Sequence, residues 1–120
     1  MLTGMLEQVT TADKGVIEPR VLAEALGVTL SDLARIAGVH RNTLARSPAS
    51  PAIQGRLGEV ARILTEASAL MGGDARRAAV WFRHQPLAGF DGETAEELVA
   101  TGKAGAVRDH LRTLRDGGYA

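Results

Sequence analysis

The chain has 120 residues, of which 14 are Lys or Arg and 14 are Asp or Glu, so its formal net charge is zero and does not point to a nucleic-acid partner. It contains no cysteine, which excludes disulfides and thiolate metal sites and suits the reducing cytoplasm, where we expect the protein to reside. No apolar run approaches the roughly 20 residues of a membrane span, and residues 1–10 lack the pattern of a signal peptide. Because the sequence is rich in Ala and Leu and only 3% aromatic, we expect an all-α protein.

Short helices are predicted at the start of the chain. Residues 1–10 place four apolar side chains on one face of a helix, namely Leu2, Met5, Leu6 and Val9. Pro19 suits the first position of another helix, which runs to about Leu26 and is closed by Gly27. We therefore separate an N-terminal segment, residues 1–18, from a helical lobe that begins at Pro19.

Residues 30–47, LSDLARIAGVHRNTLARS, predict two short helices joined by a tight turn. Thr29 and Asp32 have nearly the spacing and chemistry of a capping box, and Gly38 stands where the first helix must end, because glycine tolerates positive φ. The second helix is ended by Pro48. Side chains that suit the contact between two crossed helices are Leu33, Ala34, Ala37, Val39 and Leu44. This is the pattern of a helix-turn-helix.

Five polar side chains at the start of the second helix or within it are candidates for DNA contact: His40, Arg41, Asn42, Thr43 and Arg46. Arginine can bind guanine, and asparagine can bind adenine, through two hydrogen bonds each, while threonine and a helix N-terminus suit phosphates. Residues 29–57 carry four arginines against one acid, so this region is basic although the chain is neutral. The alternative is an ordinary solvated helix face. The helix-turn-helix pattern favours DNA binding.

A long helix is predicted from Pro51, capped by Ser50, to about Met71. Its apolar positions recur every three or four residues and form a stripe that is wide enough to pack against other elements on two sides. They are Ile53, Leu57, Val60, Ile63, Leu64, Ala67, Leu70 and Met71. We expect this helix to link the helix-turn-helix to the rest of the chain, and we place the first lobe at residues 19–72.

Three further helices are predicted in residues 73–120, which we assign to a small helical C-terminal lobe. The first follows Asp74 and stops before Pro86, the second begins with a Thr94–Glu97 capping box, and the third covers about residues 103–115.

Two aromatic positions in this lobe stand out. Trp81 and Phe82 are adjacent on one helix and must point in different directions, so we expect one to fill the core and the other to be free to anchor a partner. Tyr119 follows Gly117 and Gly118, a pattern that fits a flexible tail as well as a tail inserted into a partner.

The sequence offers no arrangement typical of catalysis or metal binding. The three histidines, His40, His84 and His110, have no ligand spacing between them. Glu96 and Glu97 fall in the first turn of a predicted helix, where acids favour the macrodipole and need no catalytic role. We therefore expect no enzymatic activity, no metal and no cofactor.

Residues 79–117, AVWFRHQPLAGFDGETAEELVATGKAGAVRDHLRTLRDG, resemble the C-terminal domain of the Xre/MbcA/ParS antitoxins. In that family an alanine–tryptophan helix leads to a proline loop, a short leucine-rich helix, a glycine-containing turn and a final helix. The matching residues are Ala79, Trp81, Phe82, Pro86, Leu87, Glu97, Leu98, Gly102, Gly105, Val107 and Leu111. The helix-turn-helix resembles the Xre part, so the likeness covers about residues 22–118.

The resemblance implies an antitoxin that binds a cognate RES-domain toxin, which consumes NAD, and blocks its active site with the C-terminal segment. By that analogy the toxin-binding residues are Trp81, Arg112, Arg115, Gly118, Tyr119 and Ala120. It also implies homodimers, hetero-oligomers with the toxin, and repression of the operon through operator DNA. Two alternatives stay open. One is a plain helix-turn-helix transcription regulator whose C-terminal lobe dimerises, and the other is a protein-binding adaptor without DNA binding.

Overall fold

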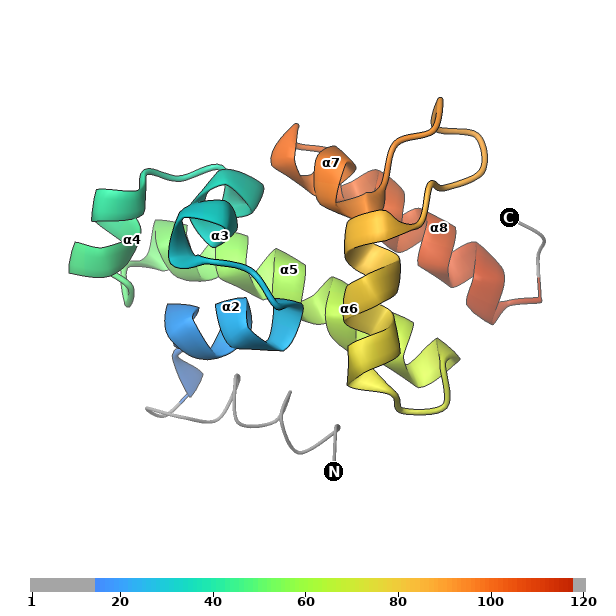
Figure 1. Cartoon of the computed structure of the whole chain (residues 1–120), viewed down its shortest axis with the longest axis horizontal. Coiled ribbons are helices and arrows are strands. Elements are labelled where there is room, and N and C mark those ends of the chain that lie inside the picture. The colour runs from blue at the N-terminus through green and yellow to red at the C-terminus, as the bar shows by residue number, and fades with distance from the viewer. Residues whose placement is uncertain (1–14, 118–120) are drawn as a thin grey trace.

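The computed structural model describes residues 15–117, and this part of the chain contains seven α-helices and no strand (Figure 1). The bounds are α2 Pro19–Leu26, α3 Leu30–Ala37, α4 Arg41–Arg46, α5 Pro51–Leu70, α6 Ala75–His84, α7 Ala95–Ala100 and α8 Ala104–Arg115. The prediction of an all-α protein is confirmed for these residues. The helix predicted within residues 1–10 lies outside the described part. None of the described helices is both long enough and apolar enough to cross a membrane.

The helix starts follow the capping signals of the sequence. Thr29 caps α3 and forms a capping box with Asp32, and Thr94 does the same for α7 with Glu97. The hydroxyl of Ser50 accepts a hydrogen bond from the backbone N–H of Ile53 at the start of α5. Asp74 accepts from the backbone N–H of Arg77 at the start of α6. Each cap satisfies a backbone donor that the helix itself cannot, so these helix starts are set locally.

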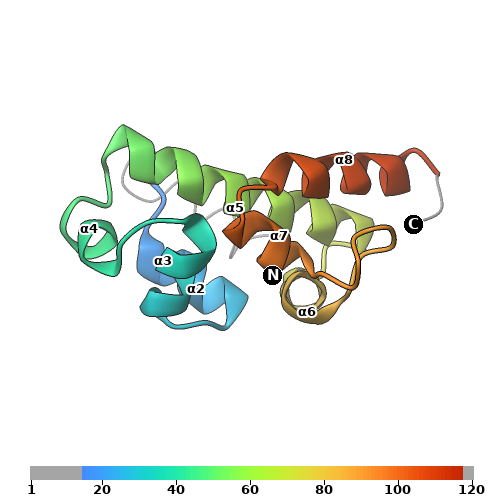
Figure 2. The same ribbon diagram turned by 90° about the horizontal axis from the view of Figure 1, so that it is seen from above.

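Helix α5 is the centre of the packing. It has 20 residues and contacts α6, α8, α2 and α3. Figure 1 places α2, α3 and α4 towards one end of the molecule and α6, α7 and α8 towards the other, and Figure 2 shows α5 running past both groups. Helix α8 packs along α5, while α6 packs on both α5 and α2. A two-sided apolar stripe on α5 is therefore required, as its spacing predicts.

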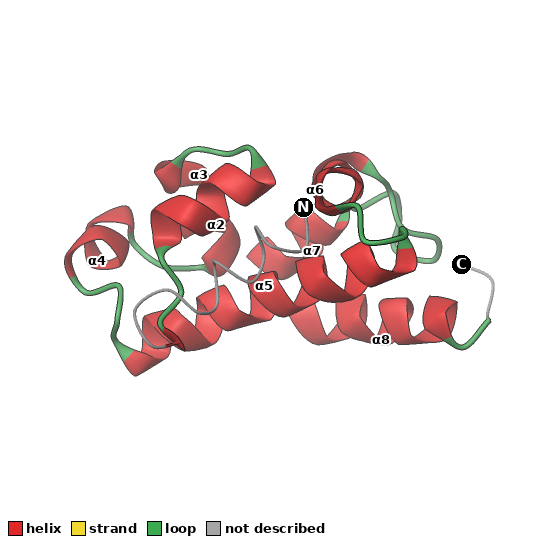
Figure 3. Ribbon diagram, turned by 90° about the horizontal axis from the view of Figure 1, so that it is seen from below, coloured by secondary structure: helices red, strands yellow, loops and turns green. Residues whose placement is uncertain are grey.

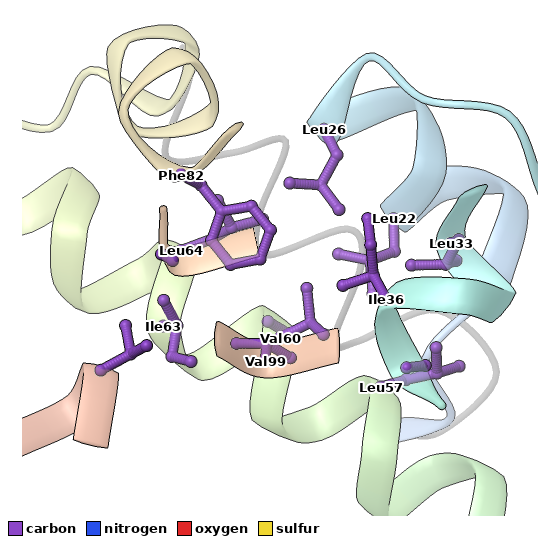
Figure 4. Close-up of a cluster of buried hydrophobic side chains, with 14 of the residues drawn as sticks. Leu22, Leu26, Leu33, Ile36, Leu57, Val60, Ile63, Leu64, Phe82 and Val99 are labelled. Atoms are coloured by element: carbon purple, nitrogen blue, oxygen red, sulfur yellow. The ribbon is translucent and has the colours of Figure 1, made fainter. Parts of the chain in front are cut away.

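The buried apolar side chains of both halves form one continuous cluster. Figure 4 shows Leu26 of α2, Leu64 of α5 and Phe82 of α6 pointing into this common core. Phe82 is the largest side chain in the core and is fully buried, whereas Trp81 is only partly buried and packs against the edge of the cluster. Phe82 is therefore the residue of this pair that fills the core. The division into lobes at residues 72 and 73 stays a prediction.

One apolar position of α5 differs from its prediction. Ile63 is fully buried, but Leu70 keeps 39% of its surface exposed. Leu70 is the last residue of the helix, and the chain turns away through Gly72 and Gly73, both at positive φ. No other element of residues 15–117 covers this end of the stripe as completely as its middle, so the periodicity of the sequence overestimates burial there.

Candidate nucleic-acid interface and partner-binding surface

The connection between α3 and α4 is a tight turn built on Gly38. Gly38 has φ of 72° and ψ of 34°, in the left-handed region that glycine enters without a steric penalty. The N–H of Gly38 donates to the carbonyl of Arg35 at 3.2 Å, and the N–H of Val39 donates to the carbonyl of Ala34 at 2.9 Å. These bonds close the end of α3, and the chain reverses directly into α4.

Small and apolar side chains hold α3 against its neighbours. Leu33 and Leu44 are fully buried, and Ala34 and Ala37 retain only 3% and 4% of their surface. Figure 3 shows α3 and α4 at one end of the bundle, on the same side of α5 as α2. A larger side chain at Ala34 would enter space already occupied by the core. The residues that the sequence assigns to a crossed-helix contact are therefore buried together, with Val39 partly buried beside them.

All five side chains predicted to contact DNA are exposed. They are His40, Arg41, Asn42, Thr43 and Arg46. His40 occupies the cap position of α4, but its side chain makes no capping hydrogen bond. Leu44 alone of α4 is buried, so this helix is anchored by one residue and presents the rest of its surface to solvent. No ion pair within residues 15–117 involves Arg41 or Arg46. Both cations are therefore available to an anionic ligand.

A shallow depression of about 360 Å³ lies at the α3–α4 turn, lined in part by Ser31, Gly38, His40 and Arg41. Arg35 also lines it, but its guanidinium is 3.8 Å from Asp32 and 3.4 Å from Glu96. The basicity counted along the sequence is thus reduced in the folded chain, because one of the four arginines of this region faces two carboxylates.

Glu96 of α7 pairs with one arginine of α3 and one of α6, a role that sequence reasoning missed. Its Oε2 accepts from Nη2 of Arg35 on α3 at 3.4 Å, and its Oε1 lies 3.4 Å from Nε of Arg83 on α6. Arg83 Nη1 also donates to the carbonyl of Gly27, at the end of α2, at 3.1 Å. The Arg83 Nε and Glu96 Oε1 atoms are buried and have no hydrogen-bond partner within residues 15–117, so the ion pair compensates their charge. The contact between Arg35 and Glu96 spans 61 residues of sequence and that between Arg83 and Gly27 spans 56, so no local sequence pattern indicates them.

Glu97, the neighbour of Glu96, forms the predicted capping box with Thr94. Glu97 closes the capping box of α7 by accepting the backbone N–H of Thr94 at 2.9 Å. The hydrogen bonds that Asp32 accepts from Thr29 in the corresponding box of α3 lower the pKa of its carboxyl group. Arg76 and Arg77 of α6 are exposed, whereas Arg83 is partly buried and faces Glu96.

Of the six residues assigned to toxin binding by resemblance, three are described, and they lie on two helices. Trp81 is on α6, and Arg112 and Arg115 are exposed on α8. Arg112 pairs with Asp109 at 2.9 Å, and Arg115 lies 3.6 Å from Asp116. The remaining three residues of the assignment, Gly118, Tyr119 and Ala120, lie outside the described residues.

The loop between α6 and α7 returns to α8. Leu87 is buried, and its N–H donates to the carbonyl of Glu93 at 2.9 Å, which closes the loop at its base. The ring of Phe90 then meets the imidazole of His110 edge-on, with centroids 6.1 Å apart. Partial burial lowers the pKa of His110, because the charged imidazolium loses hydration there. This histidine is a packing residue of the loop, and residues 15–117 contain no group of three or more side chains that could hold a metal.

No family model matches the sequence, and neither a curated protein nor a solved structure is significantly similar to it. The resemblance of residues 79–117 to antitoxins therefore rests on its motif residues, and the assignment of a surface to DNA rests on the geometry of α3 and α4.

Proposed function

We propose that this protein is an antitoxin that binds and neutralises a RES-type, NAD-consuming toxin, and that it represses its own operon through a helix-turn-helix formed by α3 and α4. In this proposal the protein is not an enzyme and acts in the cytoplasm. Residues 19–72 form the DNA-binding lobe and residues 73–120 form the toxin-binding lobe.

The observation that carries the antitoxin assignment is the agreement between motif and core in residues 79–117. The resemblance requires a helix, a proline loop, a short helix, a glycine turn and a final helix, and α6, α7 and α8 have this order and spacing. Five apolar motif positions are buried in the common core, whereas Trp81 is only partly buried; the five are Phe82, Leu87, Leu98, Val107 and Leu111. The motif is thus compatible with the fold of this half of the chain, which supports the proposal.

The exposed remainder of the lobe supplies the binding surface. Trp81 is only partly buried, and tryptophan is among the residues that contribute most to binding when an interface covers them. Arg112 and Arg115 project from the last turn of α8, immediately before the segment that we assign to the toxin's active-site entrance.

The proposal requires a gene for a RES-domain toxin beside the gene of this chain, and co-expression with that toxin tests it. The chain should restore growth and the cellular NAD level, and deletion of residues 117–120 should abolish this protection while leaving the helical content unchanged. If the truncated chain protects as well as the full chain, the C-terminal segment does not block the toxin. If the full chain neither protects nor co-purifies with the toxin, the antitoxin assignment is wrong.

A separate measurement tests DNA binding. Arg41→Ala and Arg46→Ala should each weaken binding to the operon's own promoter and lower the slope of log Kobs against log salt by about one. The matched control is Arg77→Ala, an exposed arginine of α6 outside this surface. An equal loss in all three variants would point to non-specific charge attraction. Without salt-sensitive promoter binding by the wild type, the protein would be an adaptor that does not bind DNA.

A further inference from the structure

Arg35 of α3 belongs to two groups of side chains. Its guanidinium Nη2 lies 3.4 Å from Glu96 Oε2 and 3.8 Å from Asp32 Oδ1. The same side chain lines the depression at the α3–α4 turn, together with His40 and Arg41. None of the described residues that line this depression is acidic. Two carboxylates therefore hold Arg35 although it borders a depression with a basic lining.

The contacts that hold Arg35 are weak. Both distances exceed the roughly 2.7–2.9 Å of a charge-assisted hydrogen bond, and the Arg35 side chain is 54% exposed. An exposed ion pair of this kind shifts an equilibrium by no more than about fivefold. Asp32 also has a second role, since it accepts the N–H of Thr29 in the capping box of α3. A phosphate can therefore replace these carboxylates at low cost, because its oxygens suit the same guanidinium.

Glu96 does not depend on Arg35 for the balance of its charge. Its other oxygen, Oε1, lies 3.4 Å from Nε of Arg83, and Arg83 is anchored by a hydrogen bond of 3.1 Å to the carbonyl of Gly27. The side chain of Glu96 is 15% exposed, against 54% for Arg35, so Arg35 is the partner with room to move. If Arg35 leaves, Glu96 remains paired with Arg83.

We propose that Arg35 is a further phosphate contact of the DNA surface, and that Glu96 competes with the duplex for its guanidinium. The inference rests on the proposed binding of DNA by α3 and α4. In the free chain Arg35 pairs with Glu96, and on the duplex it turns towards the depression and contacts a phosphate oxygen. Glu96 thus lowers the affinity for DNA by the free energy that is needed to release Arg35.

The neighbouring cations favour a polyanion over a single phosphate ion. Arg41 and Arg46 of α4 are exposed and form no ion pair within residues 15–117. Release of Arg35 brings the free cations of α3 and α4 to three. Duplex DNA carries closely spaced phosphates and gains from each cation that contacts one.

Fluorescence anisotropy of a labelled duplex from the region upstream of the chain's own gene, measured at several salt concentrations, tests the proposal. Glu96→Gln keeps the size of the side chain and removes its charge, so it should tighten binding about two- to fivefold. Glu97→Gln is the matched control, because it removes the same charge from the next residue of α7, which caps that helix instead of facing Arg35. This control should change the affinity much less.

A double-mutant cycle shows whether the effect passes through Arg35. Arg35→Ala should weaken binding and lower the slope of log Kobs against log salt by about one, because one phosphate contact is lost. In the Arg35→Ala background, Glu96→Gln should no longer tighten binding, since there is no guanidinium to release. Arg35→Ala changes an exposed side chain, so it tests the contact even if Glu96→Gln disturbs the fold.

Four results would overturn the proposal. Equal affinities of Glu96→Gln and a wild type that binds in a salt-sensitive manner show that Glu96 does not compete, and they leave the proposed DNA binding intact. Unchanged binding by Arg35→Ala shows that Arg35 contacts no phosphate. Equal tightening by Glu97→Gln, or by Glu96→Gln without Arg35, assigns the effect to long-range charge. Absence of salt-sensitive binding by the wild type overturns the proposed DNA binding itself, and this inference with it.

Discussion

Glu96 of α7 connects α3 and α6, and α3 leads into the turn that we propose to bind DNA, so the charge of Glu96 should contribute to the stability of the chain. Glu96→Gln keeps the size and the hydrogen-bonding oxygen of the side chain but removes the charge that faces Arg35 and Arg83. Arg83 retains its hydrogen bond to the Gly27 carbonyl in the variant. The substitution therefore tests the two ion pairs with little change in packing.

The size of the effect follows from the exposure of the three side chains. Arg35 is 54% exposed, so its pair with Glu96 is screened by solvent and contributes only about 0.2–1 kcal/mol. Glu96 is 15% and Arg83 is 32% exposed, and their contact is correspondingly stronger, about 1 kcal/mol when the partner is neutralised. We expect Glu96→Gln to lower the free energy of unfolding by about 1–2 kcal/mol in total.

Glu97→Gln is the matched control. It removes the same charge from the same first turn of α7, and glutamine can still accept the Thr94 N–H in the capping box. Urea unfolding followed by circular dichroism should place the midpoint of Glu96→Gln below that of Glu97→Gln with the same m value. Part of this difference should disappear at high salt, since Arg35 is exposed. If the two variants agree within about 0.3 kcal/mol, the three-helix connection does not stabilise the fold.

Three further predictions concern the core, a cap and pH. Phe82→Ala should lower the unfolding free energy by about 3–5 kcal/mol and Trp81→Ala by clearly less, because only Phe82 is fully buried; the reverse order in urea titrations would contradict the structure. Thr94→Ala should cost about 1 kcal/mol by removing the acceptor at the start of α7, whereas Thr94→Ser should restore most of it, and an equal loss in both would rule out capping as the cause. The pKa of His110 is lowered in the folded state, so the unfolded chain binds more protons than the folded chain just below pH 6.5. The melting temperature should therefore fall as pH decreases through about 6.5, and His110→Gln should flatten part of this dependence; an unchanged pH profile would contradict the assignment.

Most helix boundaries could be predicted because they are determined by neighbouring residues. The caps at Thr29, Ser50, Asp74 and Thr94 act within one helical turn, and glycine at position 38 permits a backbone conformation that other residues adopt at a cost. Such features need no knowledge of the tertiary fold.

Features that depend on distant parts of the chain could not be predicted. The periodicity of α6 cannot decide between Trp81 and Phe82, because the answer depends on where α5 and α2 lie. The same holds for Glu96, which the sequence presents only as an acid at a helix start. The exposure of Val80 and Leu70 depends on which surfaces other elements leave uncovered.

The candidate DNA surface was predictable in part. Exposure of Arg41, Asn42 and Arg46 follows from a short helix anchored by Leu44 alone. Arg35 adds less positive charge to this region than the sequence suggests, because it pairs with Glu96. That pairing could not be predicted, since Glu96 is 61 residues away in the sequence.

Inhibition of the purified toxin by the purified chain tests the central claim most directly. The RES-domain toxin that the proposal requires as a partner would be titrated with the full chain while its consumption of NAD is followed. We predict that NAD consumption falls to background as the chain approaches a fixed stoichiometric ratio, and that the chain alone consumes no NAD. Undiminished NAD consumption at a large excess of folded chain would contradict the account.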